Sequence, residues 1–164
     1  MNIKHHDEKI KMLVYSATIA AIYAALTIAL APISYGPVQL RLSEIMILLV
    51  LVNPRFKTGL ILGCLIANLF SPFGIVDVIF GTLATAIAVI AMSKIKNIYL
   101  ASLVPALSNG IIIGLELMYM LNLPFVETAL YVALGEFLVV TVIGVPLFKI
   151  ITSRFPAIIH GKSC

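Results

Sequence analysis

The sequence predicts an all-α integral membrane protein, a bundle of six transmembrane helices forming a single domain, and three observations predict it. Hydrophobic residues make up 62% of the 164 residues and charged residues only 11%, whereas soluble domains contain roughly 45–50% and about 25%. The mean hydropathy is +1.14, although a soluble chain of this length still exposes about a third of its surface after folding. The apolar residues also form long runs separated by short polar breaks.

Four apolar runs approach or exceed the roughly 20 residues that a helix needs to cross the hydrocarbon core. They cover residues 12–31, 76–93, 100–121 and 125–151. Pro32 ends the first run, a basic break at residues 94–97 ends the second, and Pro124 follows the third. The fourth run is long enough to tilt in the bilayer.

Two shorter helices are expected between the first two runs, at residues 42–52 and 58–71. Pro54 disfavours the α conformation at the residue before it, so a helix should stop there. The helix over 42–52 is too short to cross a bilayer at ~1.5 Å per residue, and residues 35–41 are therefore expected to dip into the membrane to meet it. Residues 1–11 and 152–164 are expected to be cytoplasmic tails.

The basic residues predict the orientation. If the N-terminus lies inside and the helices alternate, ten of the eleven Lys and Arg residues fall on one side, and only Arg41 lies elsewhere. The positive-inside rule makes that side cytoplasmic, with both termini there. These residues set the topology and meet anionic lipid, so no nucleic-acid partner is expected. Five of the seven acids lie within or near the external half: Glu44, Asp77, Glu116, Glu127 and Glu136.

Two of these acids predict a ligand site. A carboxylate at membrane depth is costly and usually faces a cavity or a partner. Glu116 lies about 24 Å along its helix and Glu136 roughly 15 Å below the outer end of its own, neither of them at a helix terminus. Glu44 and Asp77 lie near helix starts, so a ligand role competes with first-turn or capping roles and, for Glu44, with an ion pair to Arg41.

Other polar residues are expected to share that site. Ser102, Asn109 and Glu116 recur at seven-residue spacing and so lie on one helix face, and Asn68 lies near the outer end of its helix; interhelical hydrogen bonding is the alternative role. We expect a pocket open to the outside, roofed by residues 32–41, with Tyr35 among the stacking faces. Its carboxylates would attract a cation or a planar heterocycle with adjacent N–H donors.

Small residues form a second pattern, on the first helix. Four alanines repeat there at every fourth position: Ala17, Ala21, Ala25 and Ala29. Small residues allow another helix backbone to come close, so this stripe predicts packing within the bundle or docking of a partner protein. Two G-x-x-x-G pairs, Gly59/Gly63 and Gly110/Gly114, are expected to pack within the bundle.

The sequence has no motif for catalysis or for a metal. The three histidines (His5, His6 and His160) lie in the expected tails, and no H-E-x-x-H occurs. Gly161-Lys162-Ser163 resembles the end of a P-loop, but Pro156 occupies the required upstream glycine position. We therefore expect no enzyme, metal site or ATPase in this chain, and transport driven by ions or by another subunit.

Four stretches resemble the queuosine-precursor transporter (QueT) family. They are Ala31–Glu44, Gly63–Asn68, Asp77–Thr85 and Ala133–Glu136. The similarity extends from about Ala17 to Leu147. It implies the substrate-binding (S) component of an energy-coupling-factor importer, a multi-pass protein of a prokaryotic cell membrane.

The resemblance also implies partners and a ligand. A membrane-embedded coupling subunit would dock on the small residues of the first helix and join two cytoplasmic ATPases, which use ATP and Mg²⁺; this chain would hold no cofactor. The implied ligand is a 7-deazaguanine base, the aminomethyl form preQ1, captured outside under the loop that follows the first helix.

The resemblance suggests roles for the site residues. Glu116 and Glu136 would contact the guanine-like edge and the ammonium group, in either order. Glu44 and Asp77 rank behind them, with hydrogen bonds from Asn68, Asn109 and Gln39. Arg41 is expected to pair with Glu44 and order the loop. Two alternatives remain: a stand-alone proton-coupled transporter whose acids form a relay, and a membrane scaffold that transports nothing.

Overall fold

The computed structural model of the protein describes residues 3–36 and 38–154, and every element in these ranges is a helix. The elements are α1 (Ile3–Ala29), α2 (Ala31–Ser34), η1 (Leu42–Leu51), η2 (Pro54–Phe56), α3 (Lys57–Asn68), α4 (Ile75–Met92), α5 (Ile98–Leu121), α6 (Phe125–Glu136), η3 (Phe137–Gly144) and α7 (Val145–Arg154). Four helical stretches within them are long and apolar enough to cross a membrane: Asp7–Ala29, Ile75–Met92, Ile98–Leu121 and Phe125–Arg154. The predicted all-helical membrane fold class is confirmed at this level.

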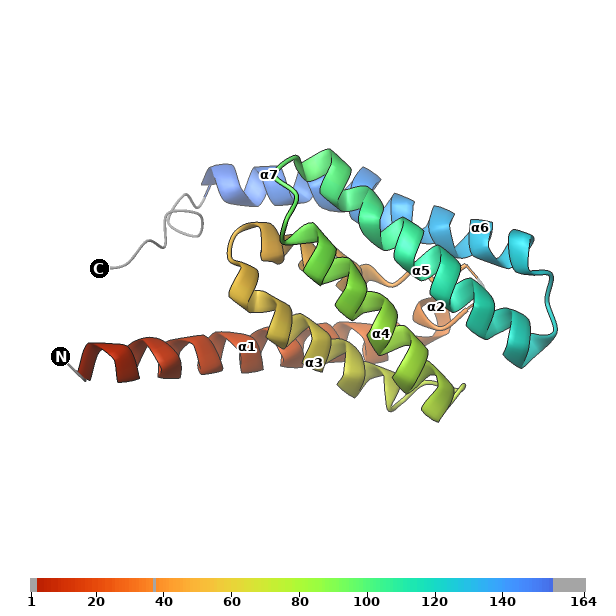
Figure 1. The fold of residues 1–164 in the computed structure, drawn as a ribbon, viewed down its shortest axis with the longest axis horizontal. Helices are drawn as coiled ribbons and strands as arrows, with labels where there is room; N and C mark the ends of the chain where they lie inside the picture. Colours follow the sequence, from red (N-terminus) through yellow and green to blue (C-terminus); the bar gives the residue numbers. More distant parts are fainter. Residues whose placement is uncertain (1–2, 37, 155–164) are drawn as a thin grey trace.

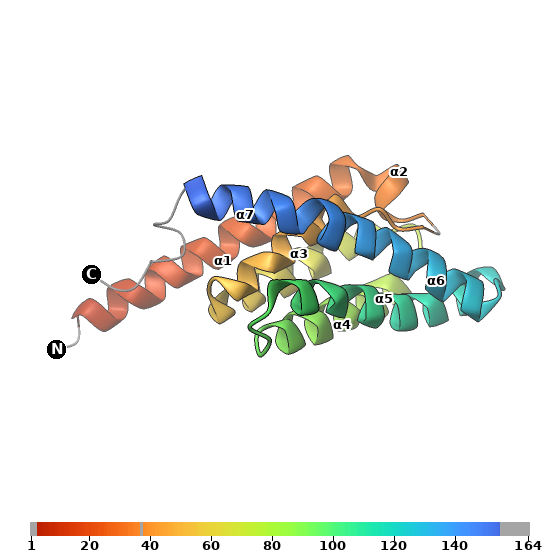
Figure 2. The same ribbon diagram turned by 90° about the horizontal axis from the view of Figure 1, so that it is seen from above.

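The chain runs back and forth along one long axis (Figure 1). η1 returns from the far end of α1, and α3, α4 and α5 then alternate in direction. α6, η3 and α7 form one continuous run, which Figure 2 shows as a single long rod. As a result, the start of α1 and the end of α7 lie at the same end of the molecule (Figure 1).

The predicted helix breaks have clear local causes. Asn53 precedes η2 and its side chain accepts a hydrogen bond from Arg55 N (3.0 Å), while Pro54 occupies the first turn. Asn97 accepts hydrogen bonds from the first two amides of α5 that follow Ile98. Asn122 ends α5 in the left-handed conformation, at φ 54°. Polar caps and Pro54 therefore accompany the breaks that the sequence predicted at these three places.

Three predicted boundaries were wrong by three residues or more. The helix expected over residues 58–71 ends at Asn68. α1 begins at Ile3 rather than at residue 12, because hydropathy marks membrane depth whereas a helix of good helix formers can continue into water. The last helix extends to Arg154 rather than 151, and it contains the π-helical segment η3. Pro146 follows this segment and has no N–H to donate, which favours irregular hydrogen bonding just before it. The rest of the predicted tails, residues 1–2 and 155–164, lies outside the described residues.

Glycines set the closest helix contacts. A Cβ built on Gly63 would lie 2.8 Å from Tyr23 Cβ, and one on Gly59 would lie 2.6 Å from Ser16 O, so α3 packs directly on α1. A Cβ on Gly110 would lie 2.9 Å from Ala133 Cβ, which brings α5 equally close to α6. The prediction that both glycine pairs pack within the bundle is confirmed.

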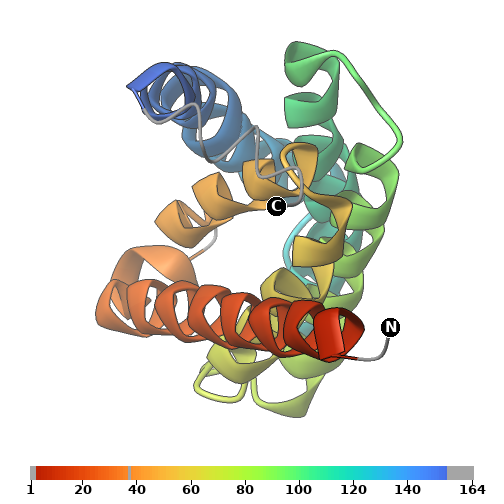
Figure 3. The same ribbon diagram turned by 90° about the vertical axis from the view of Figure 1, so that its left-hand side faces the viewer.

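The short helix η1 lies between the two ends of the chain. Viewed end-on, α1 and α7 lie on separate sides of the bundle with η1 between them (Figure 3). Ile47, Leu48 and Val50 of η1 are fully buried in the largest apolar cluster, which also includes residues of α1, α3, α4, α5, η3 and α7. η1 thereby fixes the position of the polar residues at its own first turn.

Candidate functional site

Buried polar side chains from seven parts of the fold converge near the first turn of η1. Four carboxyl groups are at most 2% exposed: Glu44 of η1, Asp77 of α4, Glu116 of α5 and Glu136 of α6. One guanidinium, that of Arg41 in the loop between α2 and η1, is buried with them. Tyr23 of α1 and Cys64 of α3 complete the cluster. We call this set the acidic cluster.

Arg41 forms its ion pair with Asp77 of α4 and not with Glu44, which follows it by three residues. Its Nη2 lies 4.0 Å from Asp77 Oδ2, and its Nη1 lies 3.8 Å from Cys64 Sγ. Its guanidinium carbon also lies 5.4 Å from the centre of the Tyr35 ring. The expected Arg41–Glu44 ion pair is therefore wrong, because the first turn of η1 directs the two side chains toward different helices.

Glu44 is held by two hydroxyl groups. The Tyr23 hydroxyl donates to Glu44 Oε1, and the Thr85 hydroxyl donates to the same oxygen at 3.4 Å. Glu44 Oε2 has no hydrogen-bond partner. Thr27 and Ser43 form a neighbouring buried hydroxyl pair at 2.6 Å. Glu44 thus ties α1, η1 and α4 together and keeps one oxygen free.

Asp77 does not cap α4. Neither of its carboxylate oxygens accepts a hydrogen bond, and the residue before the helix is Gly74, at φ 63°. Its carboxylate lies over Gly81 one turn later, where a Cβ would stand 2.5 Å from Asp77 Oδ1 and 2.6 Å from Asn68 Nδ2. The missing side chain of Gly81 therefore makes room for two polar groups at once.

Glu136 and Glu116 differ in how many of their carboxylate oxygens accept a hydrogen bond. Asn109 Nδ2 donates to Glu136 Oε1 at 2.6 Å, and Glu136 Oε2 stays unpartnered. Neither oxygen of Glu116 has a partner. Glu136 lies within electrostatic range of Glu44 and Arg41, and Glu116 within range of Asp77 and Arg41. The two acids that the sequence singled out are thus brought into one cluster with the other two.

Glu116 also borders an apolar groove on the flank of the bundle. The groove has a volume of ≈ 330 Å³ and runs between α4 and α5. Its other lining residues are Val76, Phe80, Leu115, Met118 and Tyr119. The two carboxylate oxygens of Glu116 are buried, so the groove is bordered by the apolar part of this side chain.

Two amide side chains add acceptors to the cluster. Asn68 Nδ2 donates to Cys64 Sγ (3.3 Å) and to Thr82 Oγ1 (3.4 Å), which leaves Asn68 Oδ1 unpartnered. Asn109 Oδ1 is unpartnered as well. Both amides, as predicted, lie among the acids.

The loop between α2 and η1 covers one side of the cluster. Tyr35 is buried and donates its hydroxyl to Ala67 O of α3 at 2.5 Å, so its ring is fixed beside Arg41. Burial raises the pKa of the Tyr35 phenol, against the opposing effect of the Arg41 charge. Gln39 is 3% exposed and adopts a left-handed backbone, at φ 44°. Both loop residues predicted for the site are thus placed near it.

The acidic cluster contains more carboxyl groups than cationic groups. Four carboxyl groups face one guanidinium, and each carboxyl group keeps at least one oxygen without a hydrogen bond. Buried polar atoms normally have partners, and a buried carboxylate is costly without one. Such an arrangement suits a cationic ligand that carries several N–H donors. Within the described residues, no group of three or more His, Cys, Asp or Glu side chains is placed to hold a metal ion.

Sequence reasoning missed two members of the acidic cluster and one hydroxyl group that contacts it. Tyr23, Cys64 and Thr85 are each at most 1% exposed and contact Glu44 or Arg41. A signal was available in two cases, because Cys64 precedes Asn68 by four residues, and Thr85 follows Asp77 by eight, which places each pair on one helix face.

The alanine stripe faces outward. Its four members are exposed along α1: Ala17, Ala21, Ala25 and Ala29. Ala20 and Ala24, by contrast, are buried. The stripe therefore takes no part in packing α1 onto the bundle.

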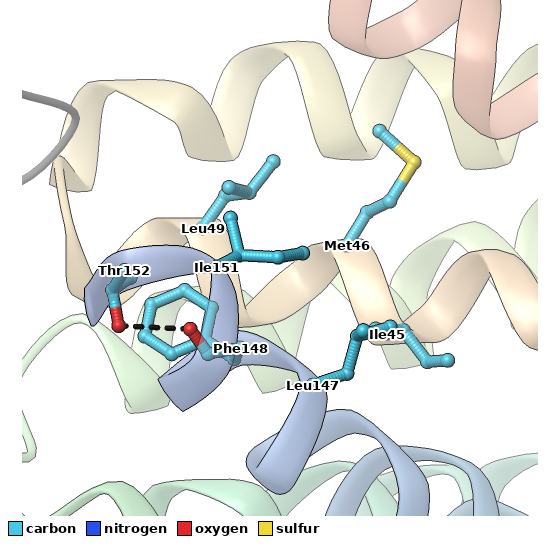
Figure 4. Close-up of a pocket in the computed structure, with 7 residues that line it drawn as sticks. All are labelled: Ile45, Met46, Leu49, Leu147, Phe148, Ile151 and Thr152. Atoms are coloured by element: carbon cyan, nitrogen blue, oxygen red, sulfur yellow. Dashed lines mark hydrogen bonds between the residues drawn. The ribbon is translucent and has the colours of Figure 1, made fainter. Parts of the chain in front are cut away.

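A separate apolar cavity of ≈ 220 Å³ lies between η1 and α7 (Figure 4). Its lining residues are Ile45, Met46, Leu49, Leu147, Phe148, Ile151 and Thr152. Its one hydroxyl, on Thr152, already donates to Phe148 O at 2.8 Å. None of the predicted ligand residues lines this cavity, so it is distinct from the acidic cluster.

Long apolar helices around a buried, acid-rich cluster define a membrane protein with an internal polar site, the general form of a membrane transporter. The comparison with known families makes this specific: residues 13–153 match the family model described as QueT transporter. The chain belongs to the QueT transporter family, and its role is that of a transporter rather than an enzyme.

A curated relative supports the same assignment. The chain is 35% identical over 137 residues to the queuosine precursor transporter QueT of Lactococcus lactis subsp. cremoris, an alignment that covers 74% of this chain and 80% of the relative. No solved structure matches the chain. The resemblance found in the four sequence stretches is thus confirmed at the level of the family.

Proposed function

We propose that this protein is the substrate-binding component of an energy-coupling-factor importer in the plasma membrane of a prokaryote. It captures a queuosine precursor from outside, a 7-deazaguanine base of the preQ1 type, and delivers it inward while partner ATPases hydrolyse ATP. The observation that carries the proposal is the acidic cluster, with four buried carboxyl groups around one guanidinium. The name of the Lactococcus relative supports the choice of a queuosine precursor.

The free oxygens favour one orientation of the base. Two parallel hydrogen bonds from adjacent N–H groups need a carboxylate with both oxygens free, and Glu116 has two such oxygens. Glu136 offers a single free oxygen, which suits the point charge of an ammonium group. Glu116 therefore binds the guanine-like edge and Glu136 the aminomethyl group.

The remaining polar groups complete the site. Asn68 Oδ1 and Asn109 Oδ1 supply further acceptors for ligand N–H groups. Gln39 and Tyr35 close the site from the loop, while Glu44 and Asp77 hold Tyr23 and Arg41 in place.

Partner docking is assigned to α1. Its exposed alanine stripe is a surface on which a second helix can pack closely, and it is the place for a membrane-embedded coupling subunit. Two cytoplasmic ATPases bind that subunit and supply ATP and Mg²⁺ chemistry that this chain does not perform.

The same proposal includes six membrane passes with both termini in the cytoplasm, η1 and α3 being the two short ones. The alternating chain path supports it, since α1 starts and α7 ends at one end of the bundle (Figure 1). The basic turns at Arg55–Lys57 and Lys94–Lys96 lie in connections that return at that same end.

Calorimetric titration of the purified protein with two bases tests the ligand assignment. The bases are preQ1 and 7-deazaguanine, which has the same edge but no aminomethyl group. Hydrogen bonds to charged groups contribute about 1.5–3 kcal/mol each, so Glu136→Gln should weaken preQ1 roughly 10- to 100-fold and leave 7-deazaguanine nearly unchanged. Glu116→Gln should weaken both bases by a similar factor.

The control is Glu127→Gln, which changes an exposed acid at the start of α6 and should leave both affinities unchanged. Absence of preQ1 binding to the wild-type protein would refute the proposed ligand. Equal losses for the two bases in Glu136→Gln would refute the orientation and leave the ligand standing.

A further inference from the structure

We propose that Gly135 is a positioning residue that seats the loop segment of residues 38–41 on α6 and thereby keeps Arg41 in the acidic cluster. The structural part of this inference does not depend on which ligand binds. Its consequence for ligand release rests on the proposed function.

The loop backbone contacts α6 directly, and the contact is possible because Gly135 has no side chain. Gly135 is buried in α6, and a Cβ built on it would overlap the carbonyl oxygen of Val38. The same Cβ would lie 3.2 Å from Gln39 O. No alanine can be placed here unless the loop or the helix moves, because both contacts are with backbone atoms.

Position 135 requires glycine because the loop backbone lies so close to it, and not because its backbone conformation is unusual. Gly135 lies within the regular part of α6, and its φ is not positive. Glycine weakens a helix interior relative to alanine, so the helix itself would favour a side chain at this position. The approach of the loop backbone is the feature that requires glycine.

The loop is held at two other points as well. Tyr35 donates to Ala67 O of α3, and Arg41 lies 4.0 Å from Asp77 of α4. Between these points, Gln39 adopts a left-handed backbone that non-glycine residues seldom use. Such a conformation persists only where its surroundings impose it, and the contact with Gly135 lies directly beside it.

Gly135 is adjacent to Glu136, so the loop backbone reaches α6 one residue before a carboxylate of the cluster. A methyl group at position 135 should lift residues 38–39 off the helix. Arg41, three residues beyond Val38, would then move away from Cys64, whose sulfur is 0% exposed and 3.8 Å from Arg41 Nη1.

Cys64 is therefore a built-in reporter of loop position. We would follow its modification by the water-soluble reagent 2-aminoethyl methanethiosulfonate in purified protein carrying Cys164→Ser. Gly135→Ala should react at least tenfold faster than the parent protein. Hydrogen–deuterium exchange should rise in residues 38–41 and stay unchanged in the rest of α6 and in α5.

Two matched glycine variants control for general effects. Gly36→Ala changes the same loop, but its Cβ would come no closer than 3.7 Å to another residue, so it should react at the parent rate. Gly110→Ala adds a methyl group 2.9 Å from Ala133 Cβ in the α5–α6 contact. It should lower the thermal midpoint without exposing Cys64.

Parent-like labelling of Gly135→Ala would overturn the proposal, and so would rapid labelling of Gly36→Ala. Loss of the folded state, or faster exchange throughout α6, would overturn it as well, because the loop and not the bundle must yield. In the same variant, preQ1 should dissociate at least tenfold faster. If preQ1 fails to bind the wild-type protein, the proposed function fails, while the labelling of Cys64 still decides the role of Gly135.

Discussion

Arg41 is the cationic side chain of the acidic cluster. It is buried with four carboxyl groups, and the nearest ionic contact is with Asp77 on a different element. The sequence placed Glu44 three residues away, a spacing that favours pairing on an exposed helix. In the folded chain Glu44 has hydroxyl partners from α1 and α4 instead, so tertiary contacts decide which acid meets the guanidinium.

The Arg41–Asp77 pair should behave as a buried ion pair. Removing one partner leaves the other charge buried and unpaired, which typically costs about 3–5 kcal/mol, whereas replacing both costs much less. Asp77→Asn and Arg41→Met should each lower the free energy of unfolding by that order. The double variant should recover at least half of the summed loss.

Unfolding in detergent can be followed by circular dichroism, since the chain has no tryptophan to report it by fluorescence. Glu127→Gln, at an exposed acid, should change the free energy of unfolding by less than about 0.5 kcal/mol. Strict additivity of the two single variants would show that the two charges are not coupled.

α1 has two different faces, one buried in the bundle and one exposed. Its buried face, with Ser16, Ala20 and Tyr23, packs on α3 and reaches Glu44. Its other face presents the exposed alanines. The periodicity of the sequence revealed the stripe of small residues, but only packing of α3 on the opposite face showed that the stripe stays free.

Bulky residues on the alanine stripe should reduce transport without changing the stability of the protein. Ala21→Leu combined with Ala25→Leu should leave the thermal midpoint and preQ1 affinity unchanged, because neither side chain packs inside the bundle. Uptake of preQ1 by cells that express the complete importer should fall at least tenfold, because a second helix can no longer come close. The matched change on the buried face is Gly63→Ala.

Gly63→Ala places a methyl group 2.8 Å from Tyr23 Cβ and should cost about 1–3 kcal/mol of stability through overpacking. Normal uptake by the variant that combines Ala21→Leu with Ala25→Leu would show that the coupling subunit docks elsewhere.

At the scale of the whole molecule, the proposed orientation places the basic turns inside the cell. Cysteine substitutions test it in intact cells that express a Cys164→Ser background, with Cys64 buried. An impermeant maleimide should label Glu127→Cys, at the start of α6, without treatment. Lys96→Cys, in the α4–α5 connection, should be labelled only after the membrane is permeabilised. The opposite pattern would invert the topology.

The apolar runs, the prolines and the polar caps determined which segments became helices. These signals are local, since helix continuation depends on nearby residues and hydropathy records the environment of each segment. The sequence alone also predicts a ligand role for Glu116 and Glu136, because an acid within an apolar run has few structural explanations.

Only the tertiary structure decided how those residues combine. It paired Arg41 with Asp77, gave Glu44 to Tyr23 and Thr85, occupied one oxygen of Glu136 with Asn109 and left both oxygens of Glu116 free. It also brought the loop at Val38 onto Gly135. The most distant of these pairs, Val38 and Gly135, are 97 positions apart in the sequence. The physical reason is that side-chain pairing depends on helix rotation and packing distance, which no local pattern specifies.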